Sequence, residues 1–224
     1  MEFMNRLRKL LRHRTEPHKT AHDYWRQCGN SFLAGDPTYY DRQEVALRGL
    51  VRSIKPAPTT ALDVGCGSGR FSIVLAEKAA EVVAFDLSQQ LIETATAAAQ
   101  AQQVVNVHFE VRDLEDGFPK RAPSDLVACM GVVSTLIDDH AFNGLLGNLQ
   151  KATRSGGHLI TKDSLSREAD IAITSGPYVT VYRSWRRYED AVSKAGFELV
   201  RKQELAADER LINHLYLWRR VKAS

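Results

Sequence analysis

The sequence contains little cysteine and no long hydrophobic run. Its three cysteines, Cys28, Cys66 and Cys129, are scattered, and no two of them have the spacing of metal ligands. This pattern argues against a disulfide scaffold and indicates reduced thiols, as in a cytoplasmic protein. No stretch approaches the roughly 20 apolar residues of a membrane span, and no apolar run follows the basic N-terminus as it would in a secretory signal. We therefore expect a cytoplasmic protein without a transmembrane segment.

A strong excess of one charge is also missing. The formal net charge is +3, and residues 1–20 carry six Lys or Arg against two Glu, so the remaining chain sums to about −1. A polyanionic ligand normally requires a basic cleft. Nucleic acid is therefore not the partner that the main body predicts.

The basic N-terminus itself is predicted to form an amphipathic helix over residues 3–14, where four apolar residues recur at helical spacing. A docking or lid helix with a solvated basic face is the favoured interpretation. Weak association of residues 1–14 with a membrane surface is the second, and an RNA-contacting arm is the third.

Alternating periodicities run through the rest of the chain, whose 224 residues, 44% apolar and 25% charged, fit one large globular domain. Short apolar runs predict strands over 60–64, 81–85, 105–111, 125–130 and 158–162. Helices are expected between them over 71–79, 89–103 and 141–153. Two more strands are expected over 197–205 and 211–221. The pattern predicts an α/β fold with a doubly wound, mostly parallel seven-stranded sheet and an antiparallel C-terminal strand pair.

Local capping signals mark three helix starts. Asp36-Pro37 predicts a helix that runs to about Ile54, with Asp as N-cap and Pro at the first helical position. Ser88 and Ser184 are expected to cap the helices that follow them. Residues 164–182 show no clear period, so they are predicted to form a long loop.

A glycine-rich turn follows the first predicted strand, in the sequence Asp63-Val-Gly-Cys-Gly-Ser-Gly69. Alternate glycines let the backbone turn sharply and let a ligand approach the main chain closely. The next helix points its free N–H groups at the same place. Asp86, at the end of the second strand, is expected beside this turn and within reach of a ribose diol. These features predict a site for a nucleoside-containing cofactor.

The spacing of the glycines distinguishes between such cofactors. A dinucleotide fingerprint requires glycine at position 70, where this chain has Arg70, and Gly69 comes one residue early. Asp63 would repel a pyrophosphate but suits a cationic ligand with an amino acid tail. The pattern resembles the first motif of class I S-adenosylmethionine (SAM)-dependent methyltransferases, D-x-G-x-G-x-G, and the resemblance extends from about residue 60 to 157. It implies a Rossmann-like fold and SAM as cofactor, with residues 36–224 as the methyltransferase domain and residues 1–35 as an N-terminal helical lid segment.

The resemblance also implies the cofactor-binding residues. They are Asp63, Gly65, Cys66, Gly67, Asp86, Leu87, Asp113, Leu114 and Met130. By this likeness Gly65 and Gly67 lie against the methionine part of SAM, with Asp63 near its ammonium. Asp86 takes the ribose hydroxyls and Asp113 contacts the adenine amino group. Each acid also has a structural interpretation. Asp63 would hold the loop by accepting backbone N–H bonds, and Asp113 would be a turn residue in a polar loop.

The acceptor pocket is expected over the carboxyl ends of the strands, between aromatic walls. The first wall comprises Tyr24, Trp25, Tyr39 and Tyr40, and the second comprises Asp163, Tyr178, Tyr182 and Arg183. Asp163 is the candidate base or orienter, and Tyr178 or Tyr182 the candidate hydrogen-bonding partners of the substrate. In the alternative interpretation Asp163 caps a turn and the tyrosines pack the lid.

The expected function is methyl transfer to a small-molecule or sugar acceptor, with oxygen favoured over nitrogen. No Asn/Asp-Pro-Pro-aromatic run occurs, which argues against adenine-N6 and related amide methyltransferases. No Pro-Cys dipeptide occurs either, which argues against cytosine-C5 methyltransferases. Metal-dependent catechol-type enzymes carry a carboxylate after the fourth strand and an Asp-Asn pair after the fifth. This chain has Met130 and Asp163-Ser164 at these places, so no metal is expected. An RNA methyltransferase that uses the basic arm and a non-catalytic SAM-binding protein are the alternatives.

Overall fold

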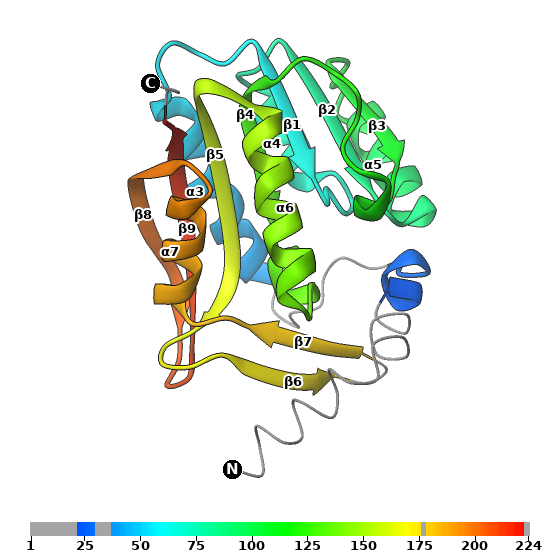
Figure 1. Ribbon diagram of the computed structural model, residues 1–224. Helices are drawn as coiled ribbons and strands as arrows, with labels where there is room; N and C mark the ends of the chain where they lie inside the picture. The colour runs from blue at the N-terminus through cyan, green and yellow to red at the C-terminus, as the bar shows by residue number, and fades with distance from the viewer. Residues whose placement is uncertain (1–21, 30–36, 176–177, 222–224) are drawn as a thin grey trace.

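A seven-stranded sheet in the order β3-β2-β1-β4-β5-β9-β8 forms the centre of the computed structural model, which describes residues 22–29, 37–175 and 178–221 (Figure 1). The strands are β1 (Thr60–Val64), β2 (Glu81–Asp86), β3 (Val107–Val111), β4 (Ser124–Met130), β5 (Thr153–Ser166), β8 (Phe197–Ala207) and β9 (Leu211–Arg220). Strands β1 to β5 pair in parallel, whereas β9 runs antiparallel to both β5 and β8. The predicted fold class, including the antiparallel C-terminal pair, is confirmed.

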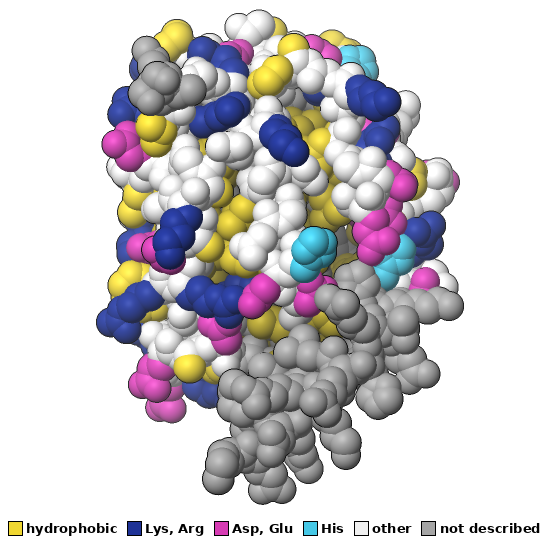
Figure 2. All heavy atoms as spheres, in the orientation of Figure 1, with side chains coloured by type: hydrophobic (Ala, Val, Ile, Leu, Met, Phe, Trp, Pro, Cys, Tyr) yellow, Lys and Arg dark blue, Asp and Glu magenta, His cyan; other side chains and the backbone are white. Residues whose placement is uncertain are grey.

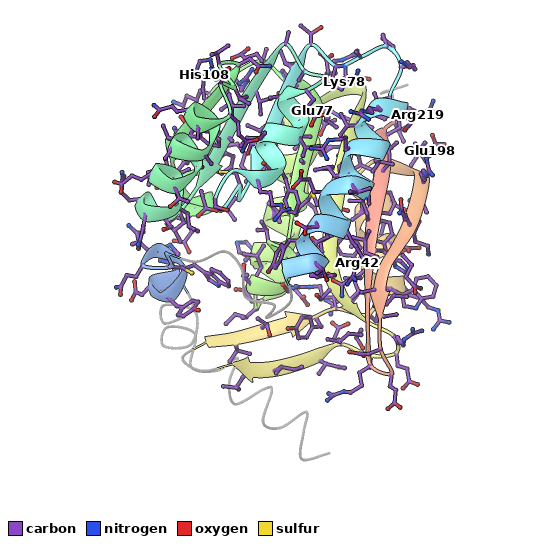
Figure 3. All side chains as sticks on the ribbon, turned by 180° about the vertical axis from the view of Figure 1, so that it is seen from behind. Arg42, Glu77, Lys78, His108, Glu198 and Arg219 are labelled. Carbon is purple, nitrogen blue, oxygen red and sulfur yellow. The ribbon has the colours of Figure 1, made fainter. Side chains whose placement is uncertain are left out.

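Helices cover both faces of this sheet. They are α3 (Pro37–Ser53), α4 (Arg70–Ala76), α5 (Gln89–Ala101), α6 (Asp139–Ala152) and α7 (Trp185–Lys194), with short 3₁₀ turns η1 (Leu114–Asp116) and η2 (Val133–Thr135). Figure 3, seen from behind, shows α3 and α4 together on one face. Arg48 of α3 donates from Nε to Glu77, just after α4, at 2.7 Å and so ties these two helices together.

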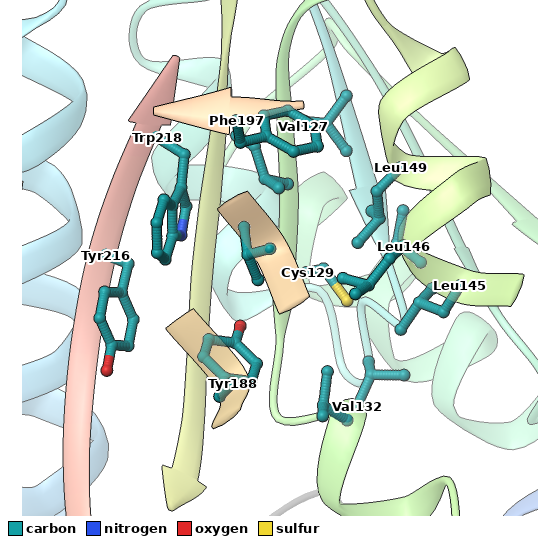
Figure 4. Packing of buried hydrophobic residues seen from close by; sticks show 14 of the residues in the cluster. Val127, Cys129, Val132, Leu145, Leu146, Leu149, Tyr188, Phe197, Tyr216 and Trp218 are labelled. Atoms are coloured by element: carbon teal, nitrogen blue, oxygen red, sulfur yellow. The ribbon is translucent and has the colours of Figure 1, made fainter. Parts of the chain in front are cut away.

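Strand alternation divides the core between the two faces. On β1, Leu62 and Val64 are buried in the cluster that contains α6 and α7, whereas Ala61 is buried in the cluster that contains α3 and α4. On β9, Trp218 belongs to the first cluster and Leu217 to the second. Figure 4 shows the first cluster at close range. Both faces of the central strands are buried, as expected for a parallel sheet between two helical layers.

The predicted caps fall where the sequence places them. The hydroxyl of Ser88 accepts from the backbone N–H of Leu91 at 3.2 Å, and that of Ser184 accepts from Arg187 at 3.3 Å. Helix α3 begins at Pro37, and its predicted cap, Asp36, lies outside the described residues. Each serine offers an acceptor to an N–H group that has no partner within its helix.

The prediction of a long loop over residues 164–182 is wrong. Strand β5 continues to Ser166, and β6 (Ile171–Ser175) and β7 (Tyr178–Tyr182) form an antiparallel hairpin. The hairpin lies across the carboxyl end of the main sheet in Figure 1. β-Branched and aromatic residues dominate both of its strands, and this composition favours β-structure. No helix in the described ranges has the length and apolarity that a bilayer crossing demands.

Candidate cofactor and acceptor site

A cavity of about 910 Å³ opens at the carboxyl ends of the central strands. Its walls come from the turn after β1, the ends of β2, β4 and β5, helix α3 and the β6–β7 hairpin. Because all these strands end on one side of a parallel sheet, their terminal residues converge there. The volume lies in the upper part of the range typical of ligand pockets, roughly 300–1,000 Å³.

The glycine-rich turn forms one wall of this cavity. Gly65, Gly67 and Gly69 all have left-handed backbone angles, with φ of 69°, 55° and 78°. A Cβ built on Gly65 would collide with the side chain of Val132, and one on Gly69 would lie 2.7 Å from Cβ of Ala95. Gly65 and Gly67 line the cavity, whereas Gly69 faces helix α5. The turn therefore requires glycine for its backbone conformation and for close packing.

Asp86 lies beside this turn and is bonded to it. Its Oδ2 accepts the backbone N–H of Gly67 at 2.9 Å, and its Oδ1 accepts that of Ser88 at 3.0 Å. Burial raises the pKa of Asp86, and these hydrogen bonds oppose the shift. A carboxylate has about four acceptor sites, and the backbone of Leu87 also bonds to Asp86, so acceptor capacity remains for about one ligand hydroxyl. Leu87, the next residue, also lines the cavity.

Asp113 lines the same cavity beyond β3, but its carboxylate already has partners from far along the chain. Its Oδ2 lies 2.5 Å from Nε2 of His22 and accepts from Arg26 at 3.1 Å. The hydroxyl of Ser88 donates to the carbonyl of Cys28 at 2.6 Å, which holds the same segment in place. Residues 22–29 thus dock on the end of the cavity where the adenine contact is predicted.

One group of possible metal ligands lies there. His22, Asp113 and Glu115 offer ligand atoms within 4.8 Å of one another. The guanidinium of Arg26 lies on the same carboxylate oxygen of Asp113 and brings a positive charge to that position. This arrangement favours an ion pair over a bound cation.

Asp63 lies behind the turn rather than on the cavity wall. It is 2% exposed, and its Oδ2 accepts from the hydroxyl of Ser72 at 2.6 Å. Burial raises the pKa of Asp63 to about 7. Its predicted contact with an ammonium group stays a prediction. The contact that the structure shows is with Ser72 in the first turn of α4. This contact agrees with the alternative interpretation, in which Asp63 stabilises the loop.

Asp163, the candidate base, is also fully buried and does not line the cavity. Its Oδ1 accepts the backbone N–H of Ser134 at 3.3 Å, and burial raises the pKa of its carboxyl group to about 7. Tyr182 does line the cavity, together with Trp25, Tyr39 and Tyr40 of the opposite predicted wall. Tyr178 begins β7, and its side chain lies outside what the structure describes.

A family of known sequences accounts for this arrangement. The sequence profile described as "Methyltransferase domain" matches residues 57–196, which span the strands from β1 to β7 and helix α7. The chain belongs to this methyltransferase family. A methyltransferase domain agrees with SAM, the cofactor that the glycine-rich turn predicts.

Curated relatives of this methyltransferase share the same region. A protein of Coxiella burnetii (strain RSA 493 / Nine Mile phase I) is 27% identical over 143 residues, which cover 62% of this chain and 56% of the relative. A protein of Xylella fastidiosa (strain 9a5c) is 30% identical over 140 residues, which cover 60% and 55%. Both are named ubiquinone biosynthesis O-methyltransferase. The chain spans a little over half the length of these relatives.

Solved structures of similar proteins show the same fold. The DhpI complex with S-adenosylhomocysteine (SAH) aligns with a TM-score of 0.70 at 21% identity, covering 93% of this chain and 98% of that one. The N-methyltransferase NodS from Bradyrhizobium japonicum WM9, also with SAH, aligns at 0.68 and 16%, covering 92% and 98%. The [4+2]-cyclase SpnF aligns at 0.69 and 16%, covering 89% and 87%. At these identities the likeness concerns the fold alone.

The residues that line the cavity of this methyltransferase suit SAM in size and in hydrogen-bonding capacity. Gly65, Cys66 and Gly67 line the cavity with no side chain larger than a thiol, so a ligand can approach the backbone. Asp86 keeps acceptor capacity beside them. Leu114 and Met130, the other two predicted contacts, line the same cavity.

Two positively charged residues of the methyltransferase are placed differently from what the sequence suggests. Arg183 was expected on the pocket wall but is 1% exposed and donates to the carbonyls of Val133, Leu136 and Asp138 at 3.1, 2.9 and 3.1 Å. It supports the wall from behind. Lys162, which no sequence motif singles out, lines the cavity instead.

Proposed function

We propose that this methyltransferase transfers the methyl group of SAM to an oxygen atom of a small-molecule acceptor. The observation that carries the proposal is the single cavity that joins the glycine-rich turn and Asp86 to a second set of side chains from α3, β5 and β7. Tyr39, Lys162 and Tyr182 belong to that second set. A cavity of about 910 Å³ has room for a small acceptor beside the cofactor.

The residues of the chain then have separable tasks. SAM supplies a methyl group that its positive sulfur already activates. Asp86 would accept from the ribose hydroxyls, Asp113 would lie toward the adenine, and Gly65 and Gly67 would leave the backbone open to the methionine part. Met130, at the end of β4, borders the methyl-donor pocket. The walls hold the acceptor in line with the methyl group and exclude water, and orientation of this kind supplies roughly 7–11 kcal/mol.

The N-terminal segment completes the cofactor end of the site. Residues 22–29 dock on Asp113 and Ser88, which supports a lid role for the segment 1–35. The predicted helix over residues 3–14, with its proposed membrane-surface association, lies outside the described residues. A cytoplasmic location agrees with three buried cysteines that form no disulfide within the described ranges.

Oxygen is favoured over nitrogen as the methylated atom. The curated relatives that share about 60% of the chain are named O-methyltransferases. NodS, an N-methyltransferase, shares the fold at 16% identity. A nucleic acid acceptor receives no support from surface charge, because Lys and Arg alternate with Asp and Glu on the face shown in Figure 2.

Incubation with SAM and a panel of acceptors tests the proposal. The panel comprises catechol, 3,4-dihydroxybenzoate, a hexose, a primary amine and total RNA, and mass spectrometry measures SAH and the methylated product. We expect SAH formation with a hydroxyl-bearing small molecule and none with Gly67→Val. Binding of SAH without turnover of any acceptor would instead indicate a non-catalytic protein or another reaction. Salt-sensitive RNA methylation that is lost on removal of residues 1–20 would indicate the RNA enzyme.

A further inference from the structure

Two polar side chains of α3 each carry a buried atom at the cavity that has no hydrogen-bond partner in the described part of the chain. Tyr39 and Gln43 are four residues apart, so they lie on the same side of the helix, and both line the cavity. Within the described part of the chain, neither Oη of Tyr39 nor Nε2 of Gln43 has a hydrogen-bond partner. Gln43 is 1% exposed. An unpaired buried polar group costs free energy, and such groups are therefore candidates for ligand contacts.

Lys162 approaches the same place from β5. It is 9% exposed, lines the cavity, and places Nζ 5.2 Å from the centre of the Tyr39 ring. Successive residues of a strand point to opposite faces. Ile160 packs against the α3 side and Leu159 against the α6 side, so Lys162 faces α3 and the cavity while Asp163 faces the other core.

Lys162 differs from the other positively charged residues of the cavity. Arg70 donates to Glu44 at 2.6 Å, and Arg112 donates to Glu110 at 2.8 Å. Among the residues that the structure describes, no carboxylate lies within ion-pair distance of Lys162. Burial lowers the pKa of its ammonium group, and the charge of Asp163 on the same strand opposes that shift. The amine therefore exchanges a proton more readily than an exposed lysine does.

Three hydrogen-bond donors thus meet at one wall. Burial raises the pKa of Tyr39, so its hydroxyl stays protonated and can donate. The amide nitrogen of Gln43 is a donor, and the ammonium form of Lys162 is another. A ligand oxygen that carries negative charge is the complement of such a set. Trp25, Tyr40 and Tyr182 add aromatic surface around it, which suits a flat ring.

We propose that Tyr39, Gln43 and Lys162 form the acceptor subsite, that the acceptor is a phenol, and that Lys162 is the base for the hydroxyl to be methylated. This inference rests on the proposed function and names its substrate class and base. The phenolic O–H bond breaks and its proton passes to the neutral amine of Lys162. The oxygen forms its new bond to the methyl carbon as the S–CH₃ bond breaks and its electron pair returns to sulfur, which yields SAH. Lys162 then releases the proton to solvent.

Lys162, rather than its neighbour Asp163, is then the base. Burial lowers the pKa of Lys162, so its amine is neutral more often than that of an exposed lysine and can accept the proton of a phenol, whose own pKa is near 10. Tyr39 and Gln43 then stabilise the phenolate as donors. Asp163, on the opposite face of β5, acts on Lys162 only through its charge.

Ionisation of a coloured phenol in the presence of SAH tests the subsite directly. The probe is 4-nitrocatechol, whose phenolate absorbs at longer wavelength than its neutral form. At one pH unit below the probe's own pKa about one tenth of it is ionised. With excess wild-type protein we expect that fraction to rise several-fold. With Lys162→Met we expect no rise, and the exposed control Lys151→Met should behave as wild type.

Turnover separates charge from base chemistry. Lys162→Arg keeps the positive charge but cannot accept a proton at neutral pH. It should therefore still favour the ionised form of the acidic probe, whereas catechol, with a pKa nearer 10, stays protonated beside it and should lose turnover by about 10²–10⁴-fold. SAH affinity should stay unchanged in both Lys162 variants. Should Lys162→Met fail to fold, Tyr39→Phe and Gln43→Leu must each weaken probe binding about five-fold.

Different outcomes test the acceptor subsite, the role of Lys162 as base, and methyl transfer itself. No ionisation of the probe by the wild type, or equal ionisation by Lys162→Met, overturns the subsite. Unchanged catechol turnover in Lys162→Arg overturns the role as base. Probe ionisation without any SAH formation by the wild type leaves the subsite in place but contradicts methyl transfer.

Discussion

The backbone N–H of Gly67 donates to Oδ2 of Asp86 across 2.9 Å, although 19 positions separate them in the chain. The bond joins the turn after β1 to the end of β2, and both sides of it face the cavity. The carboxylate of Asp86 and the bare backbone beside it are therefore one unit. Changes on either side should affect cofactor binding.

Asp86→Ala should weaken SAH binding while leaving the protein folded. The substitution removes charge-assisted hydrogen bonding to the ribose, worth about 1.5–3 kcal/mol in total, so the Kd should rise about 10- to 150-fold. Isothermal titration calorimetry measures the change. Asp116→Ala, at an exposed acid beyond the cavity, is the matched control and should bind as wild type. Equal affinity in Asp86→Ala would remove the ribose role.

Gly67→Val should fold but fail to bind SAH. The residue has φ of 55°, which costs a side-chain-bearing residue about 1–2 kcal/mol, and it lines the cavity. The added side chain should therefore occupy ligand space. Gly49→Ala, within α3 where a Cβ meets nothing, is the control and should gain about 1 kcal/mol without any change in binding. SAH binding by Gly67→Val at the wild-type level would mean that the turn faces elsewhere.

The stability of the protein without its cofactor should fall as pH rises from about 4 to 7. Burial raises the pKa of Asp63 to about 7, well above the ordinary value near 3.9 that it has in the unfolded chain. Between these values the folded state binds more protons than the unfolded state, so raising the pH favours unfolding.

Asp63→Asn should reduce that dependence, because the amide has no proton to lose and its oxygen still accepts from Ser72. The free energy of unfolding of Asp63→Asn relative to wild type should be greater at pH 8 than at pH 4, by on the order of a few kcal/mol. Urea unfolding at the two pH values gives the comparison, with Asp116→Asn as control. An identical pH dependence in wild type and Asp63→Asn would contradict the assigned cause.

Arg183→Met should destabilise the fold. The guanidinium lies 4.2 Å from the centre of the Phe142 ring and satisfies three carbonyls of the segment after β4. Losing these charge-assisted bonds leaves buried acceptors unpaired, so the free energy of unfolding should fall by about 3 kcal/mol or more. Arg186→Met, at an exposed neighbour, should have little effect. Equal melting temperatures for wild type and Arg183→Met would show that the buried arginine is dispensable.

The sequence predicts the sheet and the glycine-rich turn well, because both depend on local order. Short apolar runs before Gly65 and Asp86 encode strands, and the spacing of the glycines encodes a turn whatever the distant chain does. Ser88 and Ser184 cap their helices for the same reason. The hairpin β6–β7 is not predicted, because the local preference of Gly176-Pro177 for a chain break obscures the β-branched residues on both sides of it.

The acceptor end could not be predicted in the same way. Whether Lys162 or Asp163 faces the cavity depends on which side of β5 carries α3, and that is decided by tertiary packing. The contact of His22 with Asp113 joins positions 91 residues apart, and no local pattern reports it. The i,i+4 spacing of His22 and Arg26 is a signal for a shared helix face but not for its partner.

The structure of the protein crystallised with SAH tests the central claim most directly. We predict that SAH occupies the cavity, with its ribose hydroxyls on the carboxylate of Asp86 and its amino acid part against Gly65 and Gly67. The space beyond its sulfur should border Lys162. Folded protein whose cavity stays empty at saturating SAH, or SAH bound away from this turn, would contradict the account.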